Sequence, residues 1–221
     1  MVKKQHKKIK AAVILTCLSL VAMSGGVTGA YLTDDALKVN NVTMGNIVTT
    51  LTEPEWDKNT EEDRTVWPGR VVAKDPTVTN TVESTSPCYA YLIVETPKDV
   101  VRVYSDETGM LLNDGQAVDT ELVVYTPNDG WTELEKYRVE DNDSIKRVFA
   151  YDTELQPGDA TVPLFDQIQY VNVLEGDIDQ GTALNIPVQM VTIQSEWLSD
   201  GNGNVANTPA SAYDVYANLE R

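Results

Sequence analysis

Short runs in which apolar and polar residues alternate, each bounded by turn-forming residues, dominate this sequence. In residues 88–95 both the even and the odd positions are largely apolar, which predicts a central β-strand covered on both faces. Residues 184–190 alternate between apolar and polar side chains, which predicts a strand with one solvated face. Pro187 within it favours an edge position or a bulge, because proline cannot donate to the ladder. Clusters such as Asn113-Asp114-Gly115 separate the runs, because these residues suit the backbone angles of turns. Further strands are predicted at residues 40–51, 77–83, 121–125, 136–139, 145–151 and 165–173.

Helical periodicity is almost absent from the chain. Residues 211–219 form the best candidate helix, with Ala212, Val215 and Leu219 on one side, and a weaker helical turn is expected within residues 100–112. Roughly eight to ten short strands, spaced about ten to fifteen residues apart, are typical of a β-sandwich or a β-barrel. The pattern therefore predicts an all-β antiparallel fold with one or two short helices.

The N-terminal thirty residues have the three parts of a secretion signal. Five lysines lie in the first ten residues, an uncharged apolar stretch follows, and small residues and glycines end the segment. The small side chains of Thr28 and Ala30 predict cleavage between Ala30 and Tyr31, which divides the chain into a signal peptide (1–30) and one domain (31–221). An uncleaved membrane anchor is the alternative, since twenty uncharged residues can just span a bilayer.

The processed chain is strongly acidic. The signal holds five of the 17 basic residues and none of the 34 acidic ones, so 12 basic and 34 acidic residues remain, a net charge of −22. Such a charge disfavours nucleic acids and anionic membrane surfaces, so membrane contact is expected only before signal cleavage. It favours solubility, association with cations, or basic partners.

Histidine and cysteine are nearly absent after the signal. The single histidine, His6, lies within it, so the usual Ser-His-Asp, Cys-His and catalytic zinc sites are excluded. No catalytic residues are therefore predicted, although a pair of carboxylates, as in glycosidases, stays open. Cys88 is the one cysteine outside the signal, which rules out an intramolecular disulfide. A small buried hydrophobe is the favoured role for Cys88, with a free thiol or an intermolecular link as alternatives.

One segment offers oxygen ligands in a pattern that suits calcium. Asp200, Asn202 and Asn204 imitate the start of an EF-hand loop. The pattern then fails, because Val205 stands where glycine is needed and Ser211 stands where the loop ends in an acid. A turn is the stronger interpretation, so no cofactor is predicted, with Ca²⁺ kept as a weak candidate.

Several blocks resemble one family of Gram-positive bacterial proteins. Residues 25–34 (GGVTGAYLTD) are similar to a SipW-dependent signal peptide, which an endoplasmic-reticulum-type signal peptidase cleaves during export. Other blocks that resemble the TasA/camelysin (CalY)-like family are VTMGNI at 42–47, LTEPEWD at 51–57, KDPTVTNT at 74–81, CYAY at 88–91 and PLFD at 163–166.

The resemblance implies a jelly-roll sandwich in a biofilm matrix or at a cell surface. It implies fibres in which the freed N-terminal segment of one subunit completes the sheet of the next, by strand addition. The donor segment would begin at Tyr31 and run to about Asn46; its candidate side chains are Tyr31, Leu32, Val39, Val42 and Met44. The implied partners are further copies of the chain and other matrix proteins. Camelysin-like members are also described as metallopeptidases, which a chain without histidine after its signal does not fit.

Three functions follow from the sequence, in order of preference. The first is a secreted structural protein that assembles into fibres. The second is an adhesin-like sandwich that binds a carbohydrate or a protein with exposed aromatic rings. Its candidate rings are Trp56, Trp67, Trp131 and Trp197, for which packing in the core or on a sheet is the alternative. The third is a hydrolase that uses paired acids or a metal.

Overall fold

The computed structural model describes residues 46–60, 68–178, 184–196, 198, 199, 203 and 205–219. These residues form an all-β fold of antiparallel sheets, as predicted. The predicted signal peptide, its cleavage residues Thr28, Ala30 and Tyr31, and the candidate donor residues Leu32, Val39, Val42 and Met44 lie outside the described residues. Within the described part of the chain, no helix is long and apolar enough to cross a membrane.

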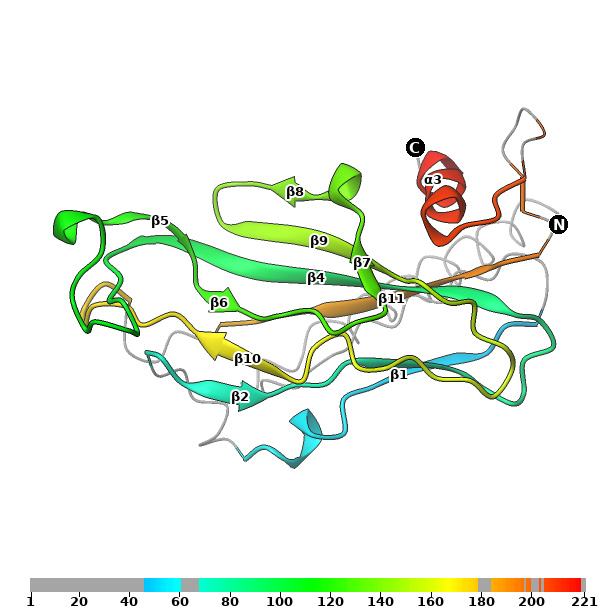
Figure 1. The fold of residues 1–221 in the computed structure, drawn as a ribbon, viewed down its shortest axis with the longest axis horizontal. Helices are drawn as coiled ribbons and strands as arrows, with labels where there is room; N and C mark the ends of the chain where they lie inside the picture. The colour runs from blue at the N-terminus through cyan, green and yellow to red at the C-terminus, as the bar shows by residue number, and fades with distance from the viewer. Residues whose placement is uncertain are drawn as a thin grey trace, which may run out of the picture. The chain divides into compact units, whose positions relative to one another are not determined.

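The larger sheet is built around one long central strand (Figure 1). Strand β4 (Cys88–Val101) lies between β11 (Val188–Gln194) and β9 (Ser144–Tyr151), and β7 (Trp131–Glu133) follows β9. Two short strands lie off this path: β5 (Val118–Glu121) pairs with β4, and β8 (Val139–Glu140) pairs with β9. The prediction of a central strand at 88–95 is confirmed.

The opposite layer consists of two smaller sheets. Strand β1 (Thr49–Thr52) pairs with β3 (Thr77–Asn80). Strand β10 (Gln167–Tyr170) lies between β2 (Val71–Ala73) and β6 (Val123–Val124). Only three residues separate β2 from β3, so these two strands follow one another along the layer.

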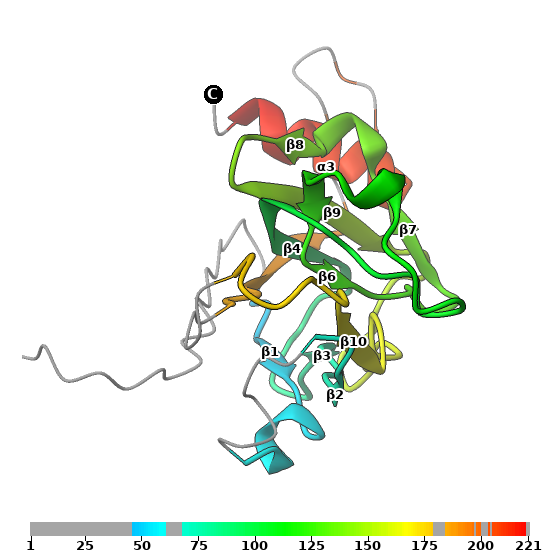
Figure 2. The same ribbon diagram turned by 90° about the vertical axis from the view of Figure 1, so that its left-hand side faces the viewer.

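The main core fills the space between the two layers (Figure 2). Leu92 and Phe149 come from the larger sheet, and Val78 and Ile168 come from the smaller ones. All four are at most 2 % exposed. This arrangement is the predicted β-sandwich, in which alternate residues of each strand point inward.

A C-terminal helix covers the outer face of the larger sheet. Helix α3 (Pro209–Leu219) confirms the helix predicted at 211–219 and packs Ala212 and Tyr213 against the sheet. The hydroxyl of Tyr91 on β4 donates a hydrogen bond to Pro209 O at 2.7 Å. Leu219, predicted on the packed side, is 74 % exposed, because it lies in the last turn of the helix.

Three local predictions differ from the structure. Of residues 136–139, predicted as a strand, the first two lie in a 3-10 helix, η3 (Glu135–Tyr137), and only Val139 lies in a strand, β8. The helical turn expected within 100–112 is replaced by the end of β4 and a tight hairpin. β11 begins at Val188 and is an edge strand as expected, but its second face is covered, because α3 packs over Val191 and Ile193. Two other short helical turns in the described residues are η1 (Trp56–Lys58) and η2 (Asn113–Gly115).

Candidate functional site: the open side of the sandwich

Strand β11 leaves one edge of the larger sheet without a strand partner among the described residues. Glu95 N donates to Pro187 O at 3.1 Å, and Ser195 N donates to Pro87 O at 3.3 Å, so the main-chain groups of residues 187 and 195 face β4. Because these groups alternate in direction along an antiparallel strand, the N–H and C=O groups of residues 188, 190, 192 and 194 face away from β4. The edge therefore offers a row of donors and acceptors over seven residues.

The composition of this edge is unusual for an unpaired strand. Natural edge strands are normally short, or carry charges and prolines that block pairing with another chain. β11 reads VQMVTIQ and contains no charged residue and no proline. The end strands of the three-stranded sheet, β2 and β6, are only three and two residues long, and β7, at the other end of the larger sheet, has three residues. β11 is thus the one long, unprotected edge in the described part of the chain.

Strand β1 bounds the same side of the sandwich in the opposite layer. Thr81 N donates to Val48 O at 2.9 Å, which turns the main chain of Thr49 and Leu51 away from β3. The hydroxyls of Thr49 and Thr192 on β11 lie 3.3 Å apart, so the two edges meet there through side chains. The apolar side chains that point inward along these edges belong to the main core: Leu51, Ile186, Val188 and Met190.

The other side of the sandwich is closed by the chain itself. Strands β5 and β6 are separated by one residue. The chain therefore crosses directly from β4 of the larger sheet to β10 of the three-stranded sheet. Trp131 of β7 spans the same gap, because its Nε1 donates to Val162 O at 3.1 Å. Among the described residues, the β1–β11 side is therefore the one left open to a further strand.

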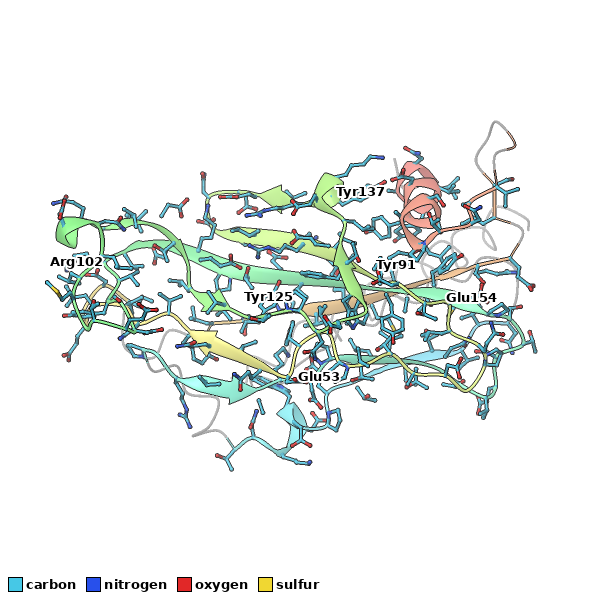
Figure 3. All side chains as sticks on the ribbon, in the orientation of Figure 1. Glu53, Tyr91, Arg102, Tyr125, Tyr137 and Glu154 are labelled. Atoms are coloured by element: carbon cyan, nitrogen blue, oxygen red, sulfur yellow. The ribbon has the colours of Figure 1, made fainter. Side chains whose placement is uncertain are left out.

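A buried clamp fixes the chain where β1 ends. The Lys74 ammonium, on a side chain that is 2 % exposed, lies 2.8 Å from Glu53 Oε2 and 4.4 Å from the centre of the Trp56 ring. Asp75 Oδ1 accepts the N–H groups of Glu55 at 2.9 Å and Trp56 at 3.3 Å. Glu53 is labelled in Figure 3. The clamp joins residues 53–57 to residues 74 and 75, two blocks that the sequence singled out without a role.

A second polar cluster is formed by one arginine, Arg147, and two glutamates, Glu121 and Glu133. Arg147 of β9 binds both carboxylate oxygens of Glu121, with Nη2 2.7 Å from Oε2, and its Nε lies 3.8 Å from Glu133 Oε1. Desolvation by burial, more than the nearby Glu135, raises the pKa of Glu133. Arg147 bonds to both carboxylate oxygens of Glu121. The cluster therefore fits a structural ion pair that joins β5 to the sheet better than it fits the acid and base pair of a hydrolase.

Three residues predicted as possible functional groups are described, and all three lie in or against the core. Cys88 is fully buried, and desolvation, with a smaller effect from Glu154, raises the pKa of its thiol to about 12. This confirms the buried-hydrophobe interpretation. Trp131 is buried, and Trp56 is partly buried beneath Lys74, so neither ring forms an exposed platform.

The other candidates lie outside the described residues: Trp67, Trp197, Asp200, Asn202 and Asn204. In the part of the chain that is described, no group of three or more histidine, cysteine, aspartate or glutamate side chains is placed to hold a metal ion.

Comparison of the chain with protein-family models, curated proteins and solved structures finds no match.

Proposed function

We propose that this chain is a secreted structural subunit of an extracellular matrix or cell surface that assembles by strand addition. In this proposal the N-terminal segment of one copy, residues 31–46, pairs with the outer edge of β11 in the next copy. The observation that carries it is the edge itself: seven residues long, free of charge and proline, and unpaired among the described residues.

The length of the donor segment suits this edge. Sixteen residues in extended conformation span about 53 Å, at about 3.3 Å per residue, whereas seven residues of β11 span about 23 Å. The segment is therefore long enough to cover the edge and still bridge the gap between two subunits. The segment leads directly into β1, which begins at Thr49. A donor segment paired with the next subunit would therefore be linked to the core of its own subunit by only a few residues.

Main-chain pairing would supply affinity, and side chains would supply selectivity. The donor would bond to the outward groups of residues 188, 190, 192 and 194, and alternate donor side chains would lie over the apolar inner face near Leu51 and Met190. Cleavage after Ala30 would then control assembly, because a signal held in the membrane keeps the segment from reaching another subunit.

The edge is tested with one substitution and a matched control. Thr192→Pro removes an N–H that faces away from β4, so the ladder within the sheet is retained while the docking edge is interrupted. Thr192→Val also loses the hydroxyl contact with Thr49 but keeps the N–H.

We expect Thr192→Val to form filaments as the unaltered protein does, and Thr192→Pro to remain monomeric in sedimentation velocity experiments and in negative-stain images. Circular dichroism and the thermal midpoint report whether each variant is folded. A folded Thr192→Pro protein that polymerises at the normal rate would show that β11 is not the acceptor.

A further inference from the structure

A polar groove lies on the smaller sheet, where β6 and β10 separate. Its volume is about 420 Å³, within the range of small-molecule sites in proteins. The residues that line it are Val124, Tyr125, Thr126, Asn128, Asp166, Gln167 and Gln169. None of these seven described residues is basic, and one carries a negative charge.

The groove exists because a strand pairing stops early. Gln169 pairs with Val124 and Tyr170 pairs with Val123, and continuing this register would place Gln167 opposite Thr126. β6 ends at Val124 instead, and the chain turns through Pro127 so that Asn128 N can donate to Leu164 O at 2.7 Å. The two backbones therefore diverge, and polar side chains line the space between them.

The hydrogen bonds around the groove fix the orientation of Asn128. Its Nδ2 donates to Pro163 O and to Asp166 Oδ1, each at 3.1 Å. Both partners are oxygen atoms, so only the amide nitrogen can occupy that position, and both of its hydrogens are used. The Asn128 Oδ1 is then the acceptor end of the amide, and Asp166, which is exposed, keeps a second carboxylate oxygen.

Gln169 is held in a similar way. Its Nε2 donates to Asp106 Oδ2 at 3.0 Å, which sets the direction of the amide and leaves its Oε1 as an acceptor. The groove thus combines oxygen acceptors that are oriented before any ligand arrives. Preorganised acceptors favour a ligand that brings several hydrogen-bond donors close together.

We propose that this groove binds a neutral saccharide. Adjacent hydroxyls on a sugar ring can donate to Asp166, Asn128 and Gln169 without bringing a negative charge toward Asp166. Anionic sugars, sulfate and phosphate are disfavoured, because no lining residue is cationic. Ca²⁺ is disfavoured as well, because it prefers six to eight oxygen ligands, commonly with several carboxylates, and Asp166 is the one carboxylate in the lining.

The groove and the proposed acceptor edge lie at different strands. The groove adjoins β6 and β10, whereas strand addition would use β11 beside β1. Saccharide binding therefore does not depend on the proposed assembly, and either proposal can fail alone. If both hold, a filament would display one groove per subunit, and a neutral polysaccharide would bind it multivalently.

Saturation-transfer difference NMR on the processed chain tests the proposal. The probes are methyl glucoside, methyl galactoside, methyl mannoside and N-acetylglucosamine, each titrated to about 20 mM, first with EDTA and then with Ca²⁺. We expect at least one sugar to bind saturably with a Kd on the order of 1 mM in EDTA, as for a shallow site with few contacts.

Variants locate the binding. Asp166→Asn keeps the side-chain shape and removes the charge, and Gln167→Ala shortens an exposed lining residue; each is expected to weaken binding by at least fivefold. Glu83→Gln, an exposed charge outside the groove, is the matched control and is expected to bind normally. The proposal is overturned if no sugar gives a saturable signal, if binding requires Ca²⁺, or if all three variants bind equally.

Discussion

The Lys74–Glu53 clamp gives the sharpest prediction about stability. Both side chains are largely buried, at 2 % and 12 % exposed, and their charged atoms lie 2.8 Å apart. At an effective dielectric constant of 20, that separation corresponds to an attraction of about 6 kcal/mol, most of which offsets the cost of burying the charges. Removing one partner leaves the other charge buried and uncompensated, which costs about 3–5 kcal/mol.

We therefore expect Glu53→Gln to cost about 3 kcal/mol, the lower end of this range, because the amide oxygen still accepts a hydrogen bond. Lys74→Met with Glu53→Leu removes both charges and is expected to recover most of the loss, since apolar replacement of a buried pair is often nearly neutral. Urea denaturation of the monomeric protein measures each free energy of unfolding. With the single variants Glu53→Leu and Lys74→Met measured as well, the double-mutant cycle isolates the coupling.

The exposed pair Glu55–Lys58 is the matched control in the adjoining turn. Its side chains are 53 % and 67 % exposed, so Glu55→Gln is expected to cost less than about 1 kcal/mol. If Glu53→Gln costs no more than Glu55→Gln, the clamp does not fix the end of β1 in the way described.

Three further predictions concern a thiol, a helix and net charge. Cys88 should resist alkylation in the folded protein at pH 8 and react after unfolding in urea, because burial raises its thiol pKa to about 12. The Tyr137 hydroxyl, and secondarily Lys136, lower the pKa of Asp214 on α3, so its stabilising effect is present above its usual pKa of 3.8 and lost as pH falls below that. The protection factors of the α3 amides, which correct for the intrinsic pH dependence of exchange, should fall at acidic pH, and Asp214→Asn should remove that fall. If the proposed filaments form, light scattering should show that they grow faster with added salt, because residues 31–221 hold 12 basic and 34 acidic residues and the net negative charge makes copies repel one another.

Local pattern was enough to predict the elements that alternation and turns define. In residues 88–95 the even and the odd positions are both largely apolar, and these residues lie in the central strand. Pro187 directly precedes β11, which is an edge strand among the described residues. The covered second face of β11 was not predictable from the strand alone. It depends on α3, which returns from the end of the chain to pack over Val191 and Ile193.

The clamp and the groove depend on contacts between distant residues. Lys74 and Glu53 are 21 residues apart, and Asn128 and Asp166 are 38 apart. Each residue alone is typical of a solvated loop, and only the fold brings them together. The sequence singled out the blocks at 51–57 and 74–81, which hold the residues of the clamp, but it did not indicate that they contact each other.

The most direct test of the account is negative-stain imaging of a protein that begins at Tyr31, beside the same protein without residues 31–46. The account predicts filaments from the first and folded monomers from the second. Filaments from both proteins, or monomers from both at high concentration and salt, would contradict assembly through the N-terminal segment.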